Sequence, residues 1–261
     1  MFRGVFLYLM QSVLRSRIMY AYIVTLLLGL ALLYFADPVL KEISLALDAN
    51  TLTAKSRDLI SSFASALVFF AVFVMSRRIP AMIGPGTAGY FLSKPLSRTR
   101  LLTYTLLSSM IVNASIIGLC MAIFGAALLI ILPAGPSGAD IALQISLEIL
   151  VLMIYAPILF FLGLLTRSGS YAFMICFTIW LVAWVLPGRE GFLMFFNSDI
   201  LSALADALYY VLPKSSKIVE FAYPRVSGLQ AGLDWMPIWS SALSALGAYG
   251  LGIIRFRRMD L

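Results

Sequence analysis

The sequence predicts an all-α, polytopic membrane protein with six transmembrane helices, an N-terminal interfacial helix and short outer amphipathic helices. Hydrophobic residues make up 62% and charged residues 12% of the 261 positions, whereas a soluble domain has roughly 25% charged residues. A soluble core of this size could not hide so much apolar side chain. Several apolar runs also approach the roughly 20 residues that a helix needs to cross a bilayer.

Six apolar runs define the expected spans within a transmembrane domain, 18–261. They cover residues 18–36, 59–75, 101–132, 141–165, 171–186 and 235–254. The third run is long enough to tilt or to extend beyond the bilayer. It ends at a cluster of turn-forming residues, 133–138. The second and fifth runs are the shortest.

Residues 1–17 form a separate N-terminal element. Apolar side chains recur there at helical spacing, at Phe2, Val5, Phe6, Leu9 and Val13. The pattern predicts a helix in the cytoplasmic membrane interface, and a plain cytosolic extension of the first span is the alternative. The first apolar run begins only after Arg17 and no convincing cleavage site precedes Asp37, so we expect it to be retained.

Lysine and arginine fall unevenly on the two sides of these spans. One side holds twelve of them with a single acid, and the other holds seven mixed with ten acids. The positive-inside rule therefore places the first side, with both chain termini, in the cytoplasm. The basic balance is a topology signal and gives no reason to expect a nucleic-acid surface.

Cysteine and histidine usage argues against several kinds of chemistry. The chain has no histidine, and Cys120 and Cys176 both fall inside expected spans. Zinc sites, histidine-based acid–base catalysis and disulfides in the outer loops are therefore unsupported. We expect no cofactor bound to this chain itself.

Two polar residues form a candidate intramembrane site. Glu148 is the only carboxylate expected well inside a span, roughly 10 Å deep in the fourth helix, and Asn113 lies in the third span. Acids within a bilayer are costly and usually functional, so proton or ion coupling is one interpretation. The alternative is a side chain that extends to the interface or pairs with a hydroxyl group.

The cytoplasmic loop 77–100 is longer than a tight turn needs. Pro80 and the glycines of 84–89 are expected to break it into short pieces, and 90–92 gives one piece an apolar face among basic residues. An apolar patch at this surface predicts a docking site for a soluble partner, while contact with anionic lipid head groups is the alternative. Ser97 is expected to cap a helix that begins at Arg98.

The outer connection 187–234 is too long for a simple hairpin. One helical stripe in it is apolar and contains Ile200, Leu201, Leu204, Leu208 and Val211. Asp199 and Asp206 stay off this stripe. The pattern predicts a short amphipathic helix at the outer leaflet.

The segment Phe91-Leu92-Ser93-Lys94-Pro95-Leu96-Ser97-Arg98 resembles the "leucine, x, x-Pro-hydrophobic-Ser-Arg" segment of permease subunits of ABC-type exporters of the drug, antibiotic and polysaccharide class. Two further segments agree, the aromatic and arginine stretch 255–261 and the stretch 209–213. Their order and spacing carry the resemblance, which covers the whole topology.

The resemblance implies a permease of a bacterial or archaeal cytoplasmic membrane that pairs with a second copy or with a related permease. It also implies two cytosolic ATPase subunits, which bind a coupling helix within 82–92 of this chain. The docking residues would be Met82, Ile83, Tyr90, Phe91, Leu92, Lys94, Pro95, Ser97 and Arg98. In this family the outer helices cap the pathway, whereas the alternative is an interfacial helix without a gating role.

The chain would then be a transport subunit and not an enzyme. ATP and Mg²⁺ would bind to the partner ATPase, because 84–90 lacks the Gly-Lys-Ser/Thr ending of a phosphate-binding loop. Two other classes remain as alternatives. An ion- or proton-coupled secondary transporter would usually show repeats, broken helices and paired intramembrane charges, and a non-transporting membrane scaffold can share the same topology.

Overall fold

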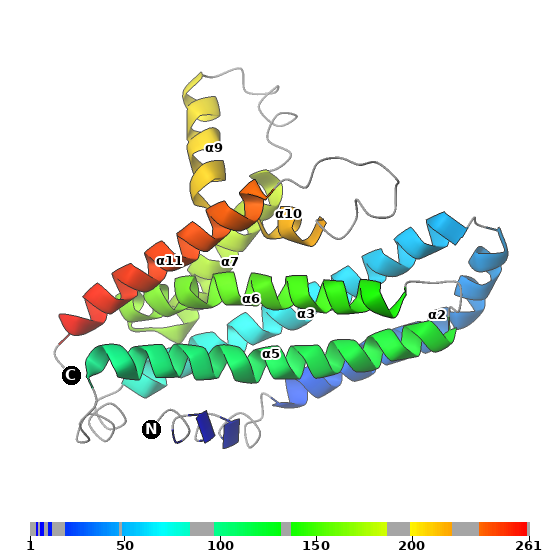
Figure 1. Ribbon diagram of the computed structural model, residues 1–261, viewed down its shortest axis with the longest axis horizontal. Coiled ribbons are helices and arrows are strands. Elements are labelled where there is room, and N and C mark those ends of the chain that lie inside the picture. Colours follow the sequence, from blue (N-terminus) through cyan, green and yellow to red (C-terminus); the bar gives the residue numbers. More distant parts are fainter. Residues whose placement is uncertain are drawn as a thin grey trace. The chain divides into compact units, whose positions relative to one another are not determined.

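The computed structural model describes residues 4, 6–7, 10–11, 19–46, 49–83, 97–131, 137–186, 199–220 and 235–259. All secondary structure in these ranges is helical (Figure 1). Of the expected interfacial helix, five residues are described and all five are helical: Gly4, Phe6, Leu7, Met10 and Gln11. Its remaining residues lie outside the described ranges, so this helix stays a prediction.

The helices follow the expected apolar runs. In chain order they are α2 (Met19–Ala46), α3 (Ala49–Ile83), α5 (Arg98–Ile131), α6 (Gly138–Thr166), α7 (Gly169–Val185), α9 (Asp199–Val211), α10 (Ser215–Glu220) and α11 (Met236–Arg257). The amphipathic helix predicted in the outer connection is confirmed as α9.

Four segments among the described residues are long and apolar enough to cross a membrane. They are Asp58–Arg77 within α3, and the whole of α5, α6 and α11. The apolar helical segment Met19–Phe35 of α2 and the helix α7 are shorter. The all-α architecture is thus confirmed for the described residues and is consistent with a membrane protein, whereas the number of six spans stays a prediction.

Two stretches expected to be loops are helical. α2 and α3 together extend through most of the polar stretch 37–58, because its alanines, leucines and lysines favour helix, although its charged residues do not favour lipid. α3 also continues to Ile83, so Pro80 does not break the chain where we expected. A proline removes one backbone hydrogen bond, and a helix that has already run for thirty residues can extend beyond that loss.

The chain divides into two compact units that each contain parts of several helices. Unit 1 consists of 1–71, 108–150 and 222–231, and unit 2 of 72–107, 151–221 and 232–261. In unit 1, the rings of Phe63 and Phe124 are stacked with their centroids 4.0 Å apart. Gly29 on α2 lies so close that a Cβ there would be 2.6 Å from the ring of Phe63.

In unit 2, α10 packs against α7 and α11, and α9 packs against α11 (Figure 1). A two-residue turn, 167–168, joins α6 to α7, and its Arg167 has a positive φ of 53°. Gly169 then begins α7 directly against α3, where a Cβ would lie 2.5 Å from the carbonyl oxygen of Ser76. Only a residue without a side chain fits this approach.

Candidate functional site

The predicted docking loop, 77–100, is described only at its two ends. Residues 77–83 are the last part of α3, and the description resumes at Ser97. Met82 and Ile83 therefore end α3, and a separate coupling helix cannot begin before residue 84. The other predicted docking residues, Tyr90, Phe91, Leu92, Lys94 and Pro95, lie outside the described residues.

Ser97 caps α5, as the sequence predicted. Its Oγ accepts a hydrogen bond from the backbone N–H of Arg100 at 3.3 Å, and α5 begins at Arg98. The first turn of a helix leaves four amide donors without intrahelical partners, and a serine oxygen satisfies one of them. The loop therefore ends at a defined helix start.

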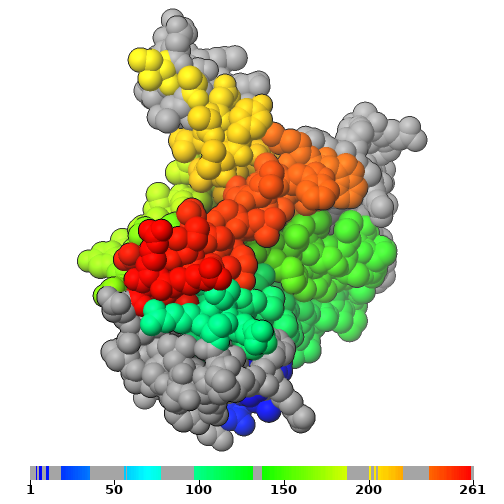
Figure 2. Space-filling view, turned by 60° about the vertical axis from the view of Figure 1, so that its left-hand side comes forward, coloured from blue at the N-terminus to red at the C-terminus, as the bar shows by residue number. Residues whose placement is uncertain are grey.

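The first turns of α5 are tied to the last turns of α11. Arg98 Nη1 donates to the carbonyl oxygens of Met259, at 2.5 Å, and Arg257, at 3.4 Å. In return, Arg257 Nε donates to Thr99 Oγ1 at 3.0 Å. Figure 2 shows the red last turns of α11 bordering the blue-green first turns of α5. These contacts hold the C-terminal end of the loop in place, which is termed its second flank.

One more hydrogen bond extends this contact along α5. The hydroxyl oxygens of Thr103 and Tyr249 are 2.7 Å apart, about one turn further from the loop on α5 and about two turns on α11. The group is termed the loop-side clamp and consists of Arg98, Thr99, Thr103, Tyr249, Arg257 and Met259.

The first flank of the loop is also held within unit 2. The backbone of Ser76 contacts Gly169 at the start of α7. The guanidinium carbon of Arg77 lies 4.9 Å from the ring centroid of Phe73, and Phe73 meets Phe173 edge to face at 5.0 Å. Both described flanks of the loop are therefore anchored to neighbouring helices of the same unit.

Glu148 is buried in α6, with 1% of its surface exposed. Gln144 Nε2 donates to its Oε1 at 3.3 Å, and Ser65 Oγ of α3 donates to the same oxygen at 3.5 Å. The carboxyl group thus pairs with a hydroxyl and an amide and does not extend to the surface. It links α3 to α6 inside unit 1.

Asn113 makes a different link in unit 1. Its Oδ1 accepts a hydrogen bond from Tyr22 Oη of α2 at 2.7 Å, and its Nδ2 donates to the carbonyl oxygen of Ser109 at 2.8 Å. No hydrogen bond joins Asn113 to Glu148 in the part of the chain that the structure describes. The two residues predicted to form one polar site therefore belong to two separate interhelical contacts.

Replacing Glu148 tests what its hydrogen bonds contribute. Glu148→Leu leaves the Gln144 amide and the Ser65 hydroxyl without their acceptor, and we expect it to lower the free energy of unfolding by about 1–3 kcal/mol. Glu148→Gln keeps a carbonyl oxygen as acceptor and should cost less. Unfolding in detergent compares the two variants, and a Glu148→Leu protein as stable as wild type would contradict the expectation.

A third polar cluster was not predicted from the sequence. Lys214, assigned above to an outer loop, is only 2% exposed. Its backbone N–H donates to Ser241 Oγ at 2.8 Å, and its Nζ donates to Ser240 Oγ at 2.7 Å. The same Nζ lies 4.6 Å from the ring centroid of Tyr209. A buried ammonium group needs such partners, because it has left water.

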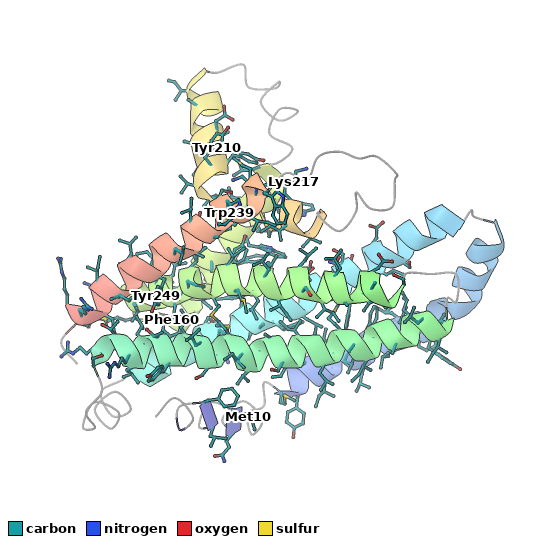
Figure 3. All side chains as sticks on the ribbon, viewed as in Figure 1. Met10, Phe160, Tyr210, Lys217, Trp239 and Tyr249 are labelled. Atoms are coloured by element: carbon teal, nitrogen blue, oxygen red, sulfur yellow. The ribbon has the colours of Figure 1, made fainter. Side chains whose placement is uncertain are left out.

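A further serine extends this cluster. Ser244 Oγ donates to the carbonyl oxygen of Val211 at the end of α9. The group is termed the far-side clamp and consists of Tyr209, Val211, Lys214, Ser240, Ser241 and Ser244. Figure 3 labels Tyr210, Lys217 and Trp239 around this junction. The serines at helical spacing on an otherwise apolar helix were the signal that could have predicted it.

Three groups of contacts thus stand out among the described residues. The loop-side clamp and the far-side clamp both lie in unit 2, at opposite ends of α11, and Glu148 with its two partners lies in unit 1. No protein-family model and no curated protein sequence matches this chain.

Proposed function

We propose that this chain is the permease subunit of an ATP-driven transporter of the ABC type, working as an exporter in a bacterial or archaeal cytoplasmic membrane. Two permeases, identical or related, form the translocation pathway. Separate cytosolic ATPase subunits dock on the loop 77–100 and supply the energy. The observation that carries the proposal is the anchoring of both described flanks of this loop, through Ser76 against Gly169 and through Arg98 against the end of α11 and the Met259 that follows it.

Anchored flanks matter because a docking loop has to pass on a displacement. A loop between frayed helix ends would absorb the movement of an ATPase in its own flexibility. The hydrogen bonds of Arg98 are charge-assisted, and such bonds are roughly twice as strong as neutral ones. A movement of the loop therefore moves the ends of α3 and α5, and it can bias the helices between inward-facing and outward-facing states.

The apolar residues of the loop are the part that the ATPase would contact. The double substitution Tyr90→Asp and Phe91→Asp introduces two charges into the docking surface. We expect it to reduce co-purification of the ATPase from mild detergent by at least about tenfold, because truncating a single aromatic anchor of an interface often costs about 2 kcal/mol or more. The tagged chain is purified from its native membranes, and ATP hydrolysis in the eluate is measured.

A matched control carries the same charges elsewhere. Ala203 and Ala207 are exposed on α9, and Ala203→Asp with Ala207→Asp should leave the co-purification unchanged. Equal loss in both variants would point to general misfolding. If no nucleotide-binding partner accompanies even the wild-type chain after crosslinking, the exporter proposal fails.

The second candidate function is an ion- or proton-coupled secondary transporter, and the burial of Glu148 in α6 favours it. Its two hydrogen bonds are long, and both reach the same oxygen. The purification above distinguishes the two candidates, because a secondary transporter needs no ATPase. A non-transporting scaffold would show neither an ATPase partner nor gradient-driven transport.

A further inference from the structure

We propose that α11 is a rigid connection between the docking loop and the helices α9 and α10, with Arg98 and Lys214 as positioning residues at its two ends. The connection itself follows from contacts within unit 2, and its role in transport rests on the proposed function. Through it, a displacement at the loop would reach α9 and α10, which the sequence places on the outer side.

At the loop end, α11 is held by side chains from the last residues of the loop, which begin α5. Arg98 is the first residue of α5 and Thr99 is the second. Arg98 donates to the carbonyl oxygens of Arg257, the last residue of α11, and of Met259, two residues beyond it, and Thr99 accepts a hydrogen bond from Arg257. The contact therefore joins the Arg98 side chain to the backbone of the other segment, and the Arg257 side chain to the Thr99 side chain. A displacement of the start of α5 pulls on the last turn of α11.

At the far end, α11 is held by the junction between α9 and α10. Lys214 lies between the last residue of α9 and the first of α10. Its main chain and its side chain bind two neighbouring serines of α11, Ser240 and Ser241, and Ser241 is fully buried. Losing Ser240 would remove a hydrogen bond from a buried ammonium group, and losing Ser241 would remove one from a buried backbone N–H, and both losses are costly. The junction therefore follows α11 when α11 moves.

The helix that carries both clamps, α11, is one continuous helix of 22 residues, about 33 Å long. Pro237 lies in its first turn, where a proline does not interrupt the hydrogen-bond ladder. Gly252 packs against α6, and a Cβ at this position would lie 3.7 Å from Cδ1 of Leu164. Gly247 and Gly250 have open space at the Cβ position, so alanine fits at both.

A second contact reaches α10 from α6, and it is weaker than the contact between Lys214 and α11. Tyr155 Oη of α6 donates to Ser215 Oγ, the first residue of α10, at 3.5 Å. This single long hydrogen bond contrasts with the hydrogen bonds of 2.7 and 2.8 Å that Lys214 makes to α11. Tyr155→Phe removes the weaker contact alone and serves as a control.

Amide hydrogen exchange of the full chain in nanodiscs tests the connection. Arg98→Ala should accelerate exchange of the α9 and α10 amides about tenfold, because loosening one end of a rigid element loosens the other. Arg100→Ala should not, since Arg100 is exposed on the same turn and its side chain makes no hydrogen bond to the described part of α11. Lys214→Met should in turn accelerate exchange in the first two turns of α5, whereas Tyr155→Phe should not.

The proposal is overturned if each substitution accelerates amide exchange only near its own end of α11 and not at the opposite end. If Arg98→Ala does not fold, Tyr249→Phe replaces it, because it removes one hydrogen bond of the same clamp, and a smaller change with the same distribution is expected. Gly247→Ala with Gly250→Ala should leave the long-range effect of Arg98→Ala intact, since alanine favours helix. These measurements need no ATPase. A long-range effect in a chain that recruits no ATPase upholds the connection and refutes the exporter role alone.

Discussion

Gly169→Val is expected to lower the free energy of unfolding by about 3 kcal/mol, the upper end of the usual cost of overpacking. A Cβ at this position would lie 2.5 Å from the carbonyl oxygen of Ser76 and 3.0 Å from the Cα of Arg77. Both neighbours are backbone atoms of α3, so no side chain can rotate away. Either α7 or the end of α3 has to shift.

The matched control for this prediction is Gly118→Val. Gly118 lies within α5 and has no atom within 4 Å of an ideal Cβ, so we expect a change within about 1 kcal/mol. Thermal unfolding in one detergent compares both variants with wild type. Because Ser76 and Arg77 form the first flank of the loop, the proposed function further predicts that Gly169→Val weakens recruitment of an ATPase. Equal stability of the two variants would disprove the close contact between α7 and α3.

The second large effect is expected in unit 1, where three helices meet at two aromatic rings. Phe63→Ala should cost about 3–5 kcal/mol, because the ring is buried and stacks on Phe124. Gly29→Ala should cost about 1–3 kcal/mol, because its Cβ would lie 2.6 Å from the ring of Phe63 and 3.2 Å from that of Phe124. Unfolding free energies of the single variants test both values.

The variant that combines Phe63→Ala with Gly29→Ala tests the contact between these two residues more directly than either single variant. In the Phe63→Ala background the shorter of the two contacts is gone, and the methyl group of Gly29→Ala occupies part of the space left by the ring. We therefore expect the two costs to be non-additive by about 1 kcal/mol or more, with Gly29→Ala nearly neutral in this background. Strict additivity would show that Gly29 and Phe63 do not contact each other.

Local patterns were sufficient to predict the helices. A bilayer offers no hydrogen-bond partner to the backbone, so an apolar run of membrane length has to form a helix. The start of α5 at Arg98 followed from Ser97 as a cap, and α9 followed from a 3.6-residue stripe. The ends of α2 and α3 could not be predicted from hydropathy. Hydropathy indicates which residues can lie in lipid, whereas helix propensity decides how far the helix continues beyond them.

Only the tertiary structure decided which polar residues meet. Glu148 and Asn113 were expected to share a site, yet each pairs with a residue of a different helix. Lys214 was assigned to a loop, yet it is buried against α11. By itself, the sequence determined the all-α class, the helices of the apolar runs apart from the ends of α2 and α3, and the start of α5, since all three depend on neighbours along the chain. Arg98 and Arg257 are 159 positions apart, and their contact depends on how the helices pack, which no local pattern records.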